Sequence, residues 1–271
     1  MNDRSSFDPA ADAENDDELD AFEVINPESD ARFLLVCDHA SRQVPYRYQG
    51  LGLDDATLHR HIAWDIGAGD VTRRLVELLD VPAVMGCISR LVIDYNRPLD
   101  DPTSIIRISD GVMIPGNQSV DETEAQLRQE RYLKPYHRAI DAMIDRFAER
   151  GIVPAVIPVH SFTPIMGGFE RPWHVGVLSD RDRRLATRLL SAFSENRAIE
   201  VGDNEPYTGR DPKSYSLQRH GEAGGRPHAT LEIRQDLIDT AHGVETWAHI
   251  VADALRHALN DEDLYREMRY V

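Results

Sequence analysis

Short apolar runs typical of buried strands alternate along this chain with longer segments whose apolar residues recur at helical spacing. The strand-like runs cover residues 32–37, a stretch that opens at 81, 89–95, 152–159, 173–178 and 228–233. The helix-like segments cover residues 65–79, 121–150, 185–193 and 244–258. Runs that are apolar throughout suit strands that are covered on both faces. The alternation therefore predicts an α/β fold, with a mixed, mostly parallel sheet flanked by helices on both faces.

The segment 121–150 is the longest predicted helix. Asp121 or Thr123 is suited to cap its N-terminus, and Gly151 is suited to end it. Pro135 lies inside the segment and lacks the N–H group that the helical ladder needs. We therefore expect the helix to be kinked or divided near this proline.

Negative charge is concentrated at the N-terminus. Among the first 30 residues eleven are acidic and only Arg4 is basic, so this segment contributes −10 to the total net charge of −17. A segment with so much charge and so few large apolar residues cannot offset the entropy lost on ordering. We expect residues 1–20 to form a disordered acidic tail. Residues 21–271 contain no Gly/Ser-rich or Pro-rich linker and are expected to form a single domain.

Composition and missing motifs argue against several classes of protein. The acidic balance would repel a phosphate backbone, which disfavours nucleic acid as a partner. No apolar run approaches the roughly 18 residues of a membrane span, and no secretion signal opens the chain, so no membrane partner is expected. Cys37 and Cys87 lie in apolar runs, which suits a reducing compartment and predicts a cytoplasmic location. The strings GxGxxG, GxxxxGK[ST] and GxSxG are absent, which argues against a bound nucleotide and a serine-hydrolase elbow.

Histidines and a carboxylate stand at or near the ends of predicted strands. His39 follows the first strand, His160 follows the strand 152–159, and Glu232 lies near the end of the strand 228–233. In an open α/β sheet the ligand site lies at the carboxyl ends of the strands, so these side chains are expected to converge. Two histidines and one carboxylate leave zinc an open position for a water molecule, whose pKa the metal lowers to about 7. The pattern indicates a metal-assisted hydrolase with one divalent ion. Zinc is the leading choice, although manganese, cobalt and iron accept the same ligands.

Two aspartates, Asp65 and Asp38, are candidates for the carboxylate that completes the metal site. Neither histidine belongs to an HxxE or HExxH signature, because the residue three positions after His39 is Arg42, which cannot ligate a cation. Asp65, at the start of the predicted helix 65–79, is our choice, and its structural alternative is a helix N-cap. Asp38 competes with it. Successive strand residues point to opposite faces, so Asp38 and His39 would not share a metal unless the strand had already ended.

The remaining polar candidates have structural alternatives. Asn96 and Arg97 follow the strand-like run 89–95, where arginine supplies a fork for a substrate carboxylate but can equally pair with a neighbouring aspartate. His59 and His61 either face solvent or line the site. Four histidines on or near predicted helices are interpreted as ordinary surface or half-buried residues: His137, His242, His249 and His257.

Several strings in one order carry a family resemblance. They are Cys37-Asp38-His39-Ala40-Ser41 with Val44-Pro45, Trp64-Asp65-Ile66-Gly67-Ala68, Asp94-Tyr95-Asn96-Arg97, Val159-His160-Ser161-Phe162-Thr163-Pro164, Asp203-Asn204-Glu205-Pro206-Tyr207, Arg219-His220-Gly221-Glu222, Pro227-His228, and Leu231-Glu232-Ile233-Arg234-Gln235-Asp236-Leu237-Ile238. Together they resemble the N-formylglutamate amidohydrolase family over about residues 33–238. That family is similar in outline to zinc carboxypeptidases and aspartoacylase, which hydrolyse an amide beside a carboxylate on an α/β sheet.

The resemblance implies roles for single residues. His39 and His160 match the two zinc histidines, and Glu232 looks like the general base. Asn96 and Arg97 resemble the pair that grips the substrate carboxylate. The sequence departs from these relatives where they place an acidic zinc ligand three residues after the first histidine.

The predicted mechanism combines both lines of reasoning. Zinc is held by His39, Asp65 and His160, and Glu232 deprotonates the attacking water. The oxyanion is stabilised by the metal and by a nearby cation, for which the candidates are Arg42 and His220. Arg234 lies two residues from Glu232, so in a strand both would face the same side, and with Asn96 and Arg97 it is expected to fix the substrate carboxylates.

The expected reaction is hydrolysis of the amide bond of an N-formyl or N-acyl amino acid such as N-formyl-L-glutamate, releasing formate and the free amino acid. The expected partner is this small molecule alone. One alternative is a deacylase or small peptidase with the same chemistry on another carboxylate-bearing amide. The other is a metal-depleted binding or regulatory homologue, which Arg42 and the missing acidic ligand motivate. Sequence gives no oligomeric state.

Overall fold

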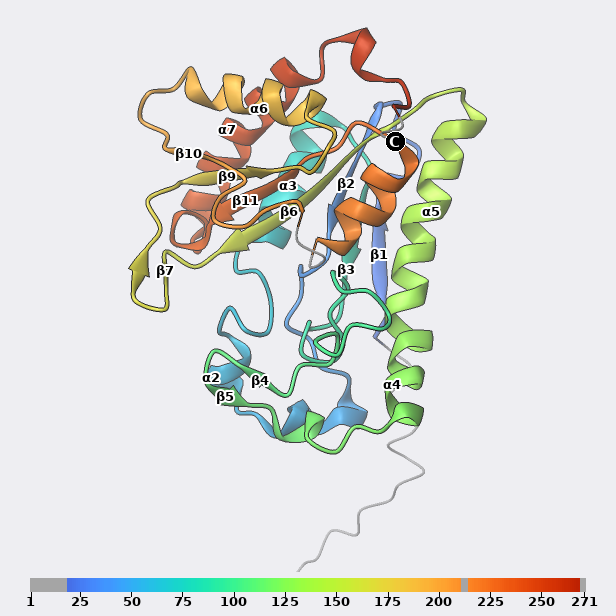
Figure 1. The fold of residues 1–271 in the computed structure, drawn as a ribbon, viewed down its shortest axis with the longest axis vertical. Helices are drawn as coiled ribbons and strands as arrows, with labels where there is room; N and C mark the ends of the chain where they lie inside the picture. Colours follow the sequence, from blue (N-terminus) through green and yellow to red (C-terminus); the bar gives the residue numbers. More distant parts are fainter. Residues whose placement is uncertain (1–18, 211–213, 269–271) are drawn as a thin grey trace, which may run out of the picture.

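A seven-stranded sheet forms the centre of the computed structural model, which describes residues 19–210 and 214–268 (Figure 1). The strands in spatial order are β1 (Phe22–Ile25), β3 (Ala83–Gly86), β2 (Phe33–Cys37), β6 (Ala155–Phe162), β11 (Thr230–Arg234), β9 (Val175–Leu178) and β10 (Val201–Asp203). Neighbouring strands pair in parallel except at β1–β3 and β11–β9. The predicted mixed, mostly parallel sheet is confirmed. The predicted tail, residues 1–20, lies outside the described residues except for Leu19 and Asp20.

Helices cover both faces of this sheet, as predicted (Figure 1). One face packs against α3 (Ala68–Leu79), α6 (Arg184–Ser194) and α7 (Ala241–Ala258). The other packs against α5 (Lys134–Glu149), which follows α4 (Glu122–Arg128) and the π-helical turn η4 (Gln129–Leu133). Strand β2 shows why two cores form. Its alternate side chains Leu35 and Cys37 enter one apolar cluster, and Leu34 and Val36 enter the other.

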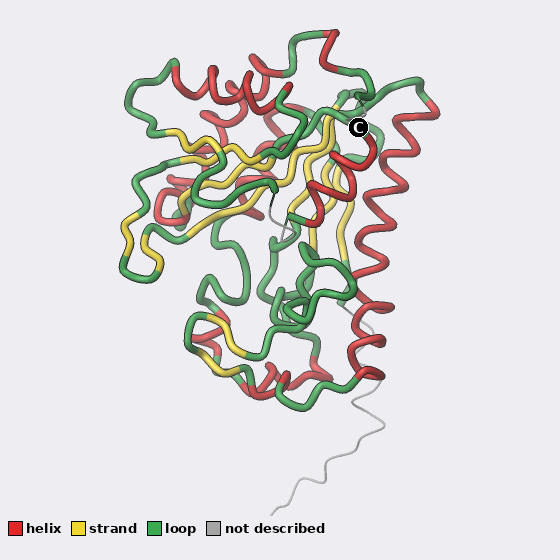
Figure 2. The backbone as a smooth tube through the Cα atoms, in the orientation of Figure 1, coloured by secondary structure: helices red, strands yellow, loops and turns green. Residues whose placement is uncertain are grey.

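Loops and short elements gather beyond the carboxyl ends of β2 and β3, as Figure 2 shows. These elements are η2 (Tyr46–Gly52), α2 (Asp55–Leu58), the hairpin of β4 (Ile108–Ser109) and β5 (Val112–Met113), and η3 (Pro115–Asn117). The other short elements are the hairpin of β7 (Ile165–Met166) and β8 (Phe169–Glu170), and the helical turns η5 (Leu217–Gly221), η6 (Glu222–Gly224), η7 (Gln235–Leu237) and η8 (Glu262–Leu264). The strand ends therefore meet a thick layer of irregular chain, which is where an α/β fold holds its ligand.

The long predicted helix is divided at its proline. Asp121 is the N-cap, because its carboxylate accepts a hydrogen bond from the Glu124 backbone N–H at 2.8 Å. The helical ladder widens to a π-turn over Gln129–Leu133, which ends two residues before Pro135. Pro135 offers no N–H and would clash with the carbonyl four residues earlier in a regular helix, so the wider turn accommodates it.

The prediction of a strand at residues 89–95 was wrong. These residues form turns, and their apolar side chains are buried against the second cluster without joining the sheet. The carbonyls that a strand would pair are satisfied by side chains instead. Asn117 donates to the carbonyl of Leu91 at 2.8 Å, and Arg128 donates to the carbonyl of Val92 at 3.0 Å. An apolar run alone cannot distinguish a buried strand from a buried loop with such partners.

Within the described part of the chain, no helix is both long and apolar enough to cross a membrane.

We predict that Gly67→Ala lowers the free energy of unfolding by ~3 kcal/mol or more. Gly67 has a φ of +77°, and a Cβ atom there would lie 2.1 Å from the carbonyl oxygen of Ile238. Gly111 is a matched control, since its φ is +74° and a Cβ atom would meet nothing within 4 Å. Gly111→Ala should cost only about 1 kcal/mol. Urea unfolding of the two variants measures the difference, and equal losses would contradict the role of close packing at Gly67.

Candidate metal centre and active-site cavity

Two histidines and one aspartate meet at the carboxyl side of the central strands. His39 follows β2, His160 lies in β6, and Asp65 lies in the loop ahead of α3. Asp65 Oδ2 is 2.7 Å from His160 Nδ1 and 3.3 Å from His39 Nδ1. One donor atom from each residue lies within 4.8 Å of the other two, and all three residues are buried. The sequence-predicted metal ligands are therefore neighbours in the fold.

The loop that carries Asp65 is fixed by the chain around it. The Asp65 backbone N–H donates to the carbonyl of His39 at 3.0 Å, and the Ser161 hydroxyl donates to the carbonyl of Ile66 at 2.8 Å. Helix α3 begins only at Ala68, with Gly67 as its N-cap, so Asp65 does not cap it. The carboxylate is left to face the histidines.

A carboxylate also stands at the far nitrogen of each histidine. His39 Nε2 is 2.7 Å from Asp94 Oδ1, and His160 Nε2 is 3.2 Å from Asp38 Oδ2. Asp38 is further held by hydroxyl groups, since Tyr136 and Ser216 each donate to its Oδ1 at 2.7 Å. Carboxylates in this position fix ring orientation and raise the basicity of the nitrogen that faces a metal.

The charges around the cluster of His39, Asp65 and His160 suit a bound cation. Burial lowers the pKa of His160, but the neighbouring carboxylates of Asp38 and Asp65 outweigh it and raise the pKa well above its usual value. Burial likewise opposes ionisation of Asp65, yet its histidine neighbours lower its pKa. The cluster therefore favours positive charge at its centre. Two imidazole nitrogens and one carboxylate oxygen are a donor set that zinc and related divalent ions accept, so the residues fit a metal.

Glu232 is a second buried carboxylate beside this cluster. It lies in β11 directly opposite His160 in the neighbouring strand β6. Its Oε2 atom is buried and has no hydrogen-bond partner among the described residues. Burial raises the pKa of Glu232 to about 7. An unpartnered carboxyl with a pKa near neutrality is suited to exchange protons with a bound molecule.

These groups open into a cavity of about 450 Å³. Its lining includes the three predicted metal ligands, Glu232, and the predicted substrate-binding residues Asn96 and Arg97. Asn96 is anchored to the segment ahead of η5, because its Oδ1 accepts a hydrogen bond from the Ser216 backbone N–H at 3.0 Å. The structure thus brings six of the nine predicted site residues to one cavity.

The other three predicted site residues lie elsewhere. Arg42 points to Asp55 at 3.4 Å on the surface and does not line the cavity. Arg234 is the last residue of β11 and donates to Asp236 at 2.8 Å, and it does not line the cavity. His220 is buried between His137 and Asp141. Arg42, Arg234 and His220 are therefore not among the residues that line the cavity.

Most of the remaining histidines are placed as predicted. His61 lines the cavity and lies 3.7 Å from Asp110, while His59 is exposed. Three are exposed on α7: His242, His249 and His257. His137 differs from the prediction, because it is buried and its Nδ1 lies 2.8 Å from His220 Nε2. Its Nε2 donates to the carbonyl of Tyr95 at 2.9 Å.

Sequence reasoning missed Arg90, which lines the cavity beside the metal cluster. Its Nη2 donates to Asp94 Oδ2 at 2.7 Å and its Nη1 lies 3.4 Å from Asp65 Oδ1. The signal was present as a single arginine inside the apolar run 89–95. Interpreting that run as a strand concealed it, since the turns are what aim the guanidinium at the cavity.

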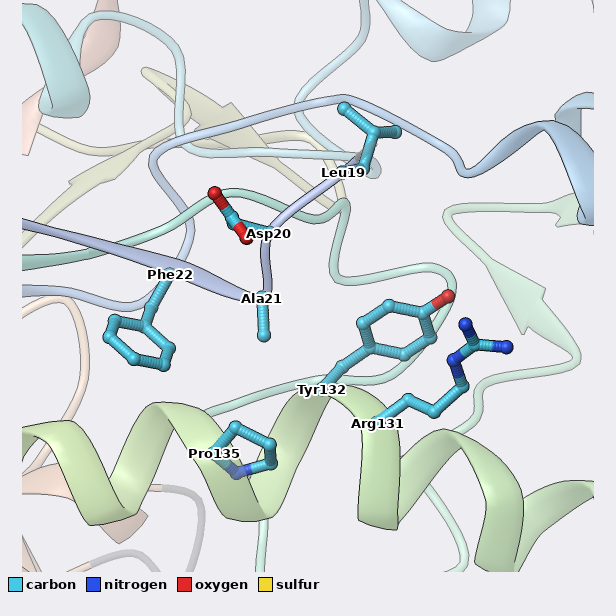
Figure 3. Close-up of a pocket in the computed structure, with 7 residues that line it drawn as sticks. All are labelled: Leu19, Asp20, Ala21, Phe22, Arg131, Tyr132 and Pro135. Carbon is cyan, nitrogen blue, oxygen red and sulfur yellow. The ribbon is translucent and has the colours of Figure 1, made fainter. Parts of the chain in front are cut away.

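A second hollow, of about 470 Å³, lies between the segment Leu19–Phe22 and the helix that carries Arg131, Tyr132 and Pro135 (Figure 3). Its lining holds no histidine and a single carboxylate, Asp20. It contains none of the predicted site residues and carries no catalytic grouping.

Comparison with known proteins assigns a family to this arrangement. A sequence model described as N-formylglutamate amidohydrolase matches residues 31–239. The crystal structure of gene product Atu2144 from Agrobacterium tumefaciens is 34% identical, with a TM-score of 0.86 over 89% of this chain and 95% of that one. The structure of N-formylglutamate amidohydrolase from Ralstonia eutropha is 20% identical, with a TM-score of 0.62 over 88% of this chain and 97% of that one. No functionally curated protein matched the chain.

We predict that His39→Ala and His160→Ala each abolish stoichiometric binding of a divalent metal, because each removes one of three donor groups. Asp94→Asn should weaken metal affinity by about 10- to 100-fold, because it removes the carboxylate behind His39. His249→Ala, on the exposed side of α7, is the matched control. Mass-spectrometric metal analysis after dialysis against zinc measures the effect. Unchanged metal content in either histidine variant would contradict the assignment.

We also predict acid sensitivity from the buried histidine pair. Burial and the adjacent His220 lower the pKa of His137 to about 4, so the folded state resists a proton that the unfolded chain accepts near pH 6.5. The stability from this neutral histidine is complete above pH 6.5 and is lost as the pH falls toward 4, by about 3 kcal/mol. His137→Gln should flatten the dependence of unfolding free energy on pH between 7 and 5. His257→Gln, at an exposed position, should leave that slope unchanged.

Proposed function

This chain belongs to the N-formylglutamate amidohydrolase family, and on that basis we propose that it hydrolyses the amide bond of an N-formyl or other N-acyl amino acid. The products are the carboxylate of the acyl group, formate in the simplest case, and the free amino acid. The observation that carries the proposal is the buried cluster of His39, Asp65 and His160 beside the unpartnered carboxyl of Glu232.

The three clustered residues, His39, Asp65 and His160, would hold one divalent ion through one donor atom each. Such an ion supplies Lewis acidity, which polarises a carbonyl group and makes water a better nucleophile at neutral pH. Zinc is the proposed ion because two imidazoles and one carboxylate are a frequent ligand set of catalytic zinc.

Glu232 is proposed to move the proton. Its Oε2 takes a proton from the attacking water and passes it to the amide nitrogen that leaves, so that the C–N bond breaks to a neutral amine. Burial places its pKa near 7, so the carboxyl gains and loses a proton at little cost near neutral pH. The neighbouring strand β6 places it opposite His160, beside the three residues proposed to hold the metal.

Arg90 is proposed to stabilise the oxyanion, the role that sequence reasoning gave to Arg42 or His220. Its guanidinium lines the cavity and is fixed by Asp94 at 2.7 Å and 3.1 Å. A fixed cation acts on developing negative charge without the cost of reorienting during the reaction. Asn96 and Arg97, in the same lining, are proposed to hold the substrate carboxylate.

The alternative of a binding protein without metal chemistry has less support. It arose because the sequence lacks an acidic residue three positions after His39. Asp65 offers that carboxylate from a different loop, at 2.7 Å from His160. A deacylase acting on a larger acyl group is a variant of the same proposal, since the cavity of about 450 Å³ offers space for one. A cytoplasmic location is also proposed, supported by the free thiols of Cys37 and Cys87.

We predict that Glu232→Gln lowers kcat by 10²- to 10⁴-fold, because the amide cannot accept the water proton. Bound metal should be unchanged, since Glu232 is not one of the three clustered donors. Glu149→Gln, exposed at the end of α5, is the matched control and should keep full activity. Release of formate from N-formyl-L-glutamate and metal analysis of the same samples measure both quantities. Wild-type turnover in Glu232→Gln would overturn its assignment as the base.

A further inference from the structure

Arg171 is a buried cation whose hydrogen-bond partners are all neutral. It follows β8 and is only 7% exposed. Its Nη1 donates to the carbonyl of Thr163 at 3.2 Å, to the Thr163 hydroxyl at 3.1 Å and to the Tyr207 hydroxyl at 3.2 Å. Its Nη2 lies 2.9 Å from the sulfur of Met166. Among the residues that the structure describes, no carboxylate lies within ion-pair distance of this guanidinium.

Arg128 shows how this protein otherwise treats a buried arginine. It is 2% exposed, and its Nε donates to a carboxylate oxygen of Glu124 at 2.8 Å. A buried charge is normally compensated by an opposite charge, because neutral hydrogen bonds recover only part of the lost hydration. Arg171 is therefore a cation that still lacks an anion.

The neutral partners of Arg171 connect it to the active-site cavity. Thr163, Met166 and Tyr207 all line that cavity, while Arg171 lies directly behind them. Its guanidinium also lies 4.9 Å from the centre of the Tyr207 ring. The positive charge is thus separated from the cavity only by these side chains.

The Tyr207 hydroxyl is the polar group through which this charge can act. Its oxygen accepts from Arg171, and within the described ranges 19–210 and 214–268 it donates no hydrogen bond of its own. Its proton is therefore available to a molecule in the cavity. Tyr207 is 39% exposed and lines the cavity, and the desolvation of its hydroxyl by the surrounding protein raises its pKa, so the hydroxyl keeps that proton at neutral pH.

The strand order places Arg171 and Tyr207 on the opposite side of the site from Asn96 and Arg97, the residues proposed to hold the substrate carboxylate. Asn96 and Arg97 come from the chain after β3, whereas Arg171 and Tyr207 come from the segments next to β9 and β10. The strands β2, β6 and β11, which position the proposed metal ligands and Glu232, lie between these two sides. A substrate held at the centre therefore meets one recognition point on each side.

We propose that Tyr207, polarised by Arg171, recognises an acidic side chain of the substrate, and that this pair makes the enzyme selective for N-acyl amino acids with a second carboxylate. The inference rests on the proposed amidohydrolase function and adds the residues that select the amino acid. Tyr207 donates its hydroxyl proton to the carboxylate, and Arg171 is the positioning residue that fixes the hydroxyl and supplies the compensating charge. A substrate with a neutral side chain leaves the charge of Arg171 uncompensated, so that substrate binds less tightly.

The test compares N-formyl-L-glutamate with N-formyl-L-glutamine, which has the same shape but a neutral amide. Zinc-loaded wild-type enzyme should prefer the glutamate compound by roughly 10- to 100-fold in kcat/KM. Tyr207→Phe and Arg171→Met should each reduce this preference to a few-fold. The loss should appear in the KM of the glutamate compound, while the kinetic constants for the glutamine compound stay within about threefold of wild type.

Matched variants separate recognition from support of the cavity wall. Arg171→Lys keeps the charge and should restore part of the preference that Arg171→Met loses. Tyr46→Phe and Arg138→Met alter exposed residues that do not line the cavity and should behave as wild type. Equal losses on both substrates in Tyr207→Phe and Arg171→Met would show a purely structural role and overturn the proposal. So would a wild-type enzyme without preference.

A binding measurement distinguishes failure of this inference from failure of the proposed function. If zinc-loaded wild-type protein hydrolyses neither compound, the amidohydrolase proposal fails, and calorimetric binding of L-glutamate and L-glutamine then tests the recognition pair alone. Tighter binding of L-glutamate that disappears in Tyr207→Phe supports the pair. Equal affinity for both amino acids overturns it.

Discussion

The contact on which this structure depends is the approach of the Asp65 carboxylate to two histidine rings, 2.7 Å from His160 and 3.3 Å from His39. These residues come from three separate segments, so their meeting requires the neighbouring strands β2 and β6 to be in register and the loop ahead of α3 to fold against them. The contact is also costly, because a buried carboxylate and two buried imidazoles lose their hydration. A bound cation would offset this cost, which couples metal affinity to folding. The buried charged groups therefore lower the stability of the metal-free protein, and they are the same groups that would bind the cation.

The surroundings of this cluster reduce that cost and orient its members. Asp94 and Asp38 lie behind the two histidines, and each is in turn satisfied by other side chains, Arg90 for Asp94 and the Tyr136 hydroxyl for Asp38. Every one of these partners comes from a loop or a helix outside the sheet. The irregular layer beyond the strand ends thus supplies the groups that orient the site. The turns at residues 89–95 contribute most to it. They provide Arg90, whose position a strand would not have allowed.

Sequence patterns identified the elements that carry the site better than they identified the directions of side chains. His39, His160 and Glu232 were located because buried strands end in polar residues, and parallel strands bring those ends together. Arg234 is the last residue of β11 and lies outside the cavity lining, because sharing a strand face with Glu232 does not place a side chain at the same depth along the strand. Arg42 was a candidate for the cation that stabilises the oxyanion, but the loop after β2 turns it toward Asp55. The number of residues between two positions in a loop says little about the directions of their side chains, since the dihedral angles of a loop do not repeat.

The sequence by itself determined the α/β class, the mixed sheet with helices on both faces, the family, and the two histidines with the carboxylates beside them. These follow from hydrophobic periodicity and from short strings of residues, which are local properties of the chain. Only the tertiary structure decided that Asp65 lies between the histidines while Asp38 lies behind one of them. It alone placed Arg90 in the cavity and Arg171 behind its wall. Such choices depend on contacts between residues that are far apart in the sequence, such as Asp65 with His160 and Asp38 with His160, which no local pattern encodes.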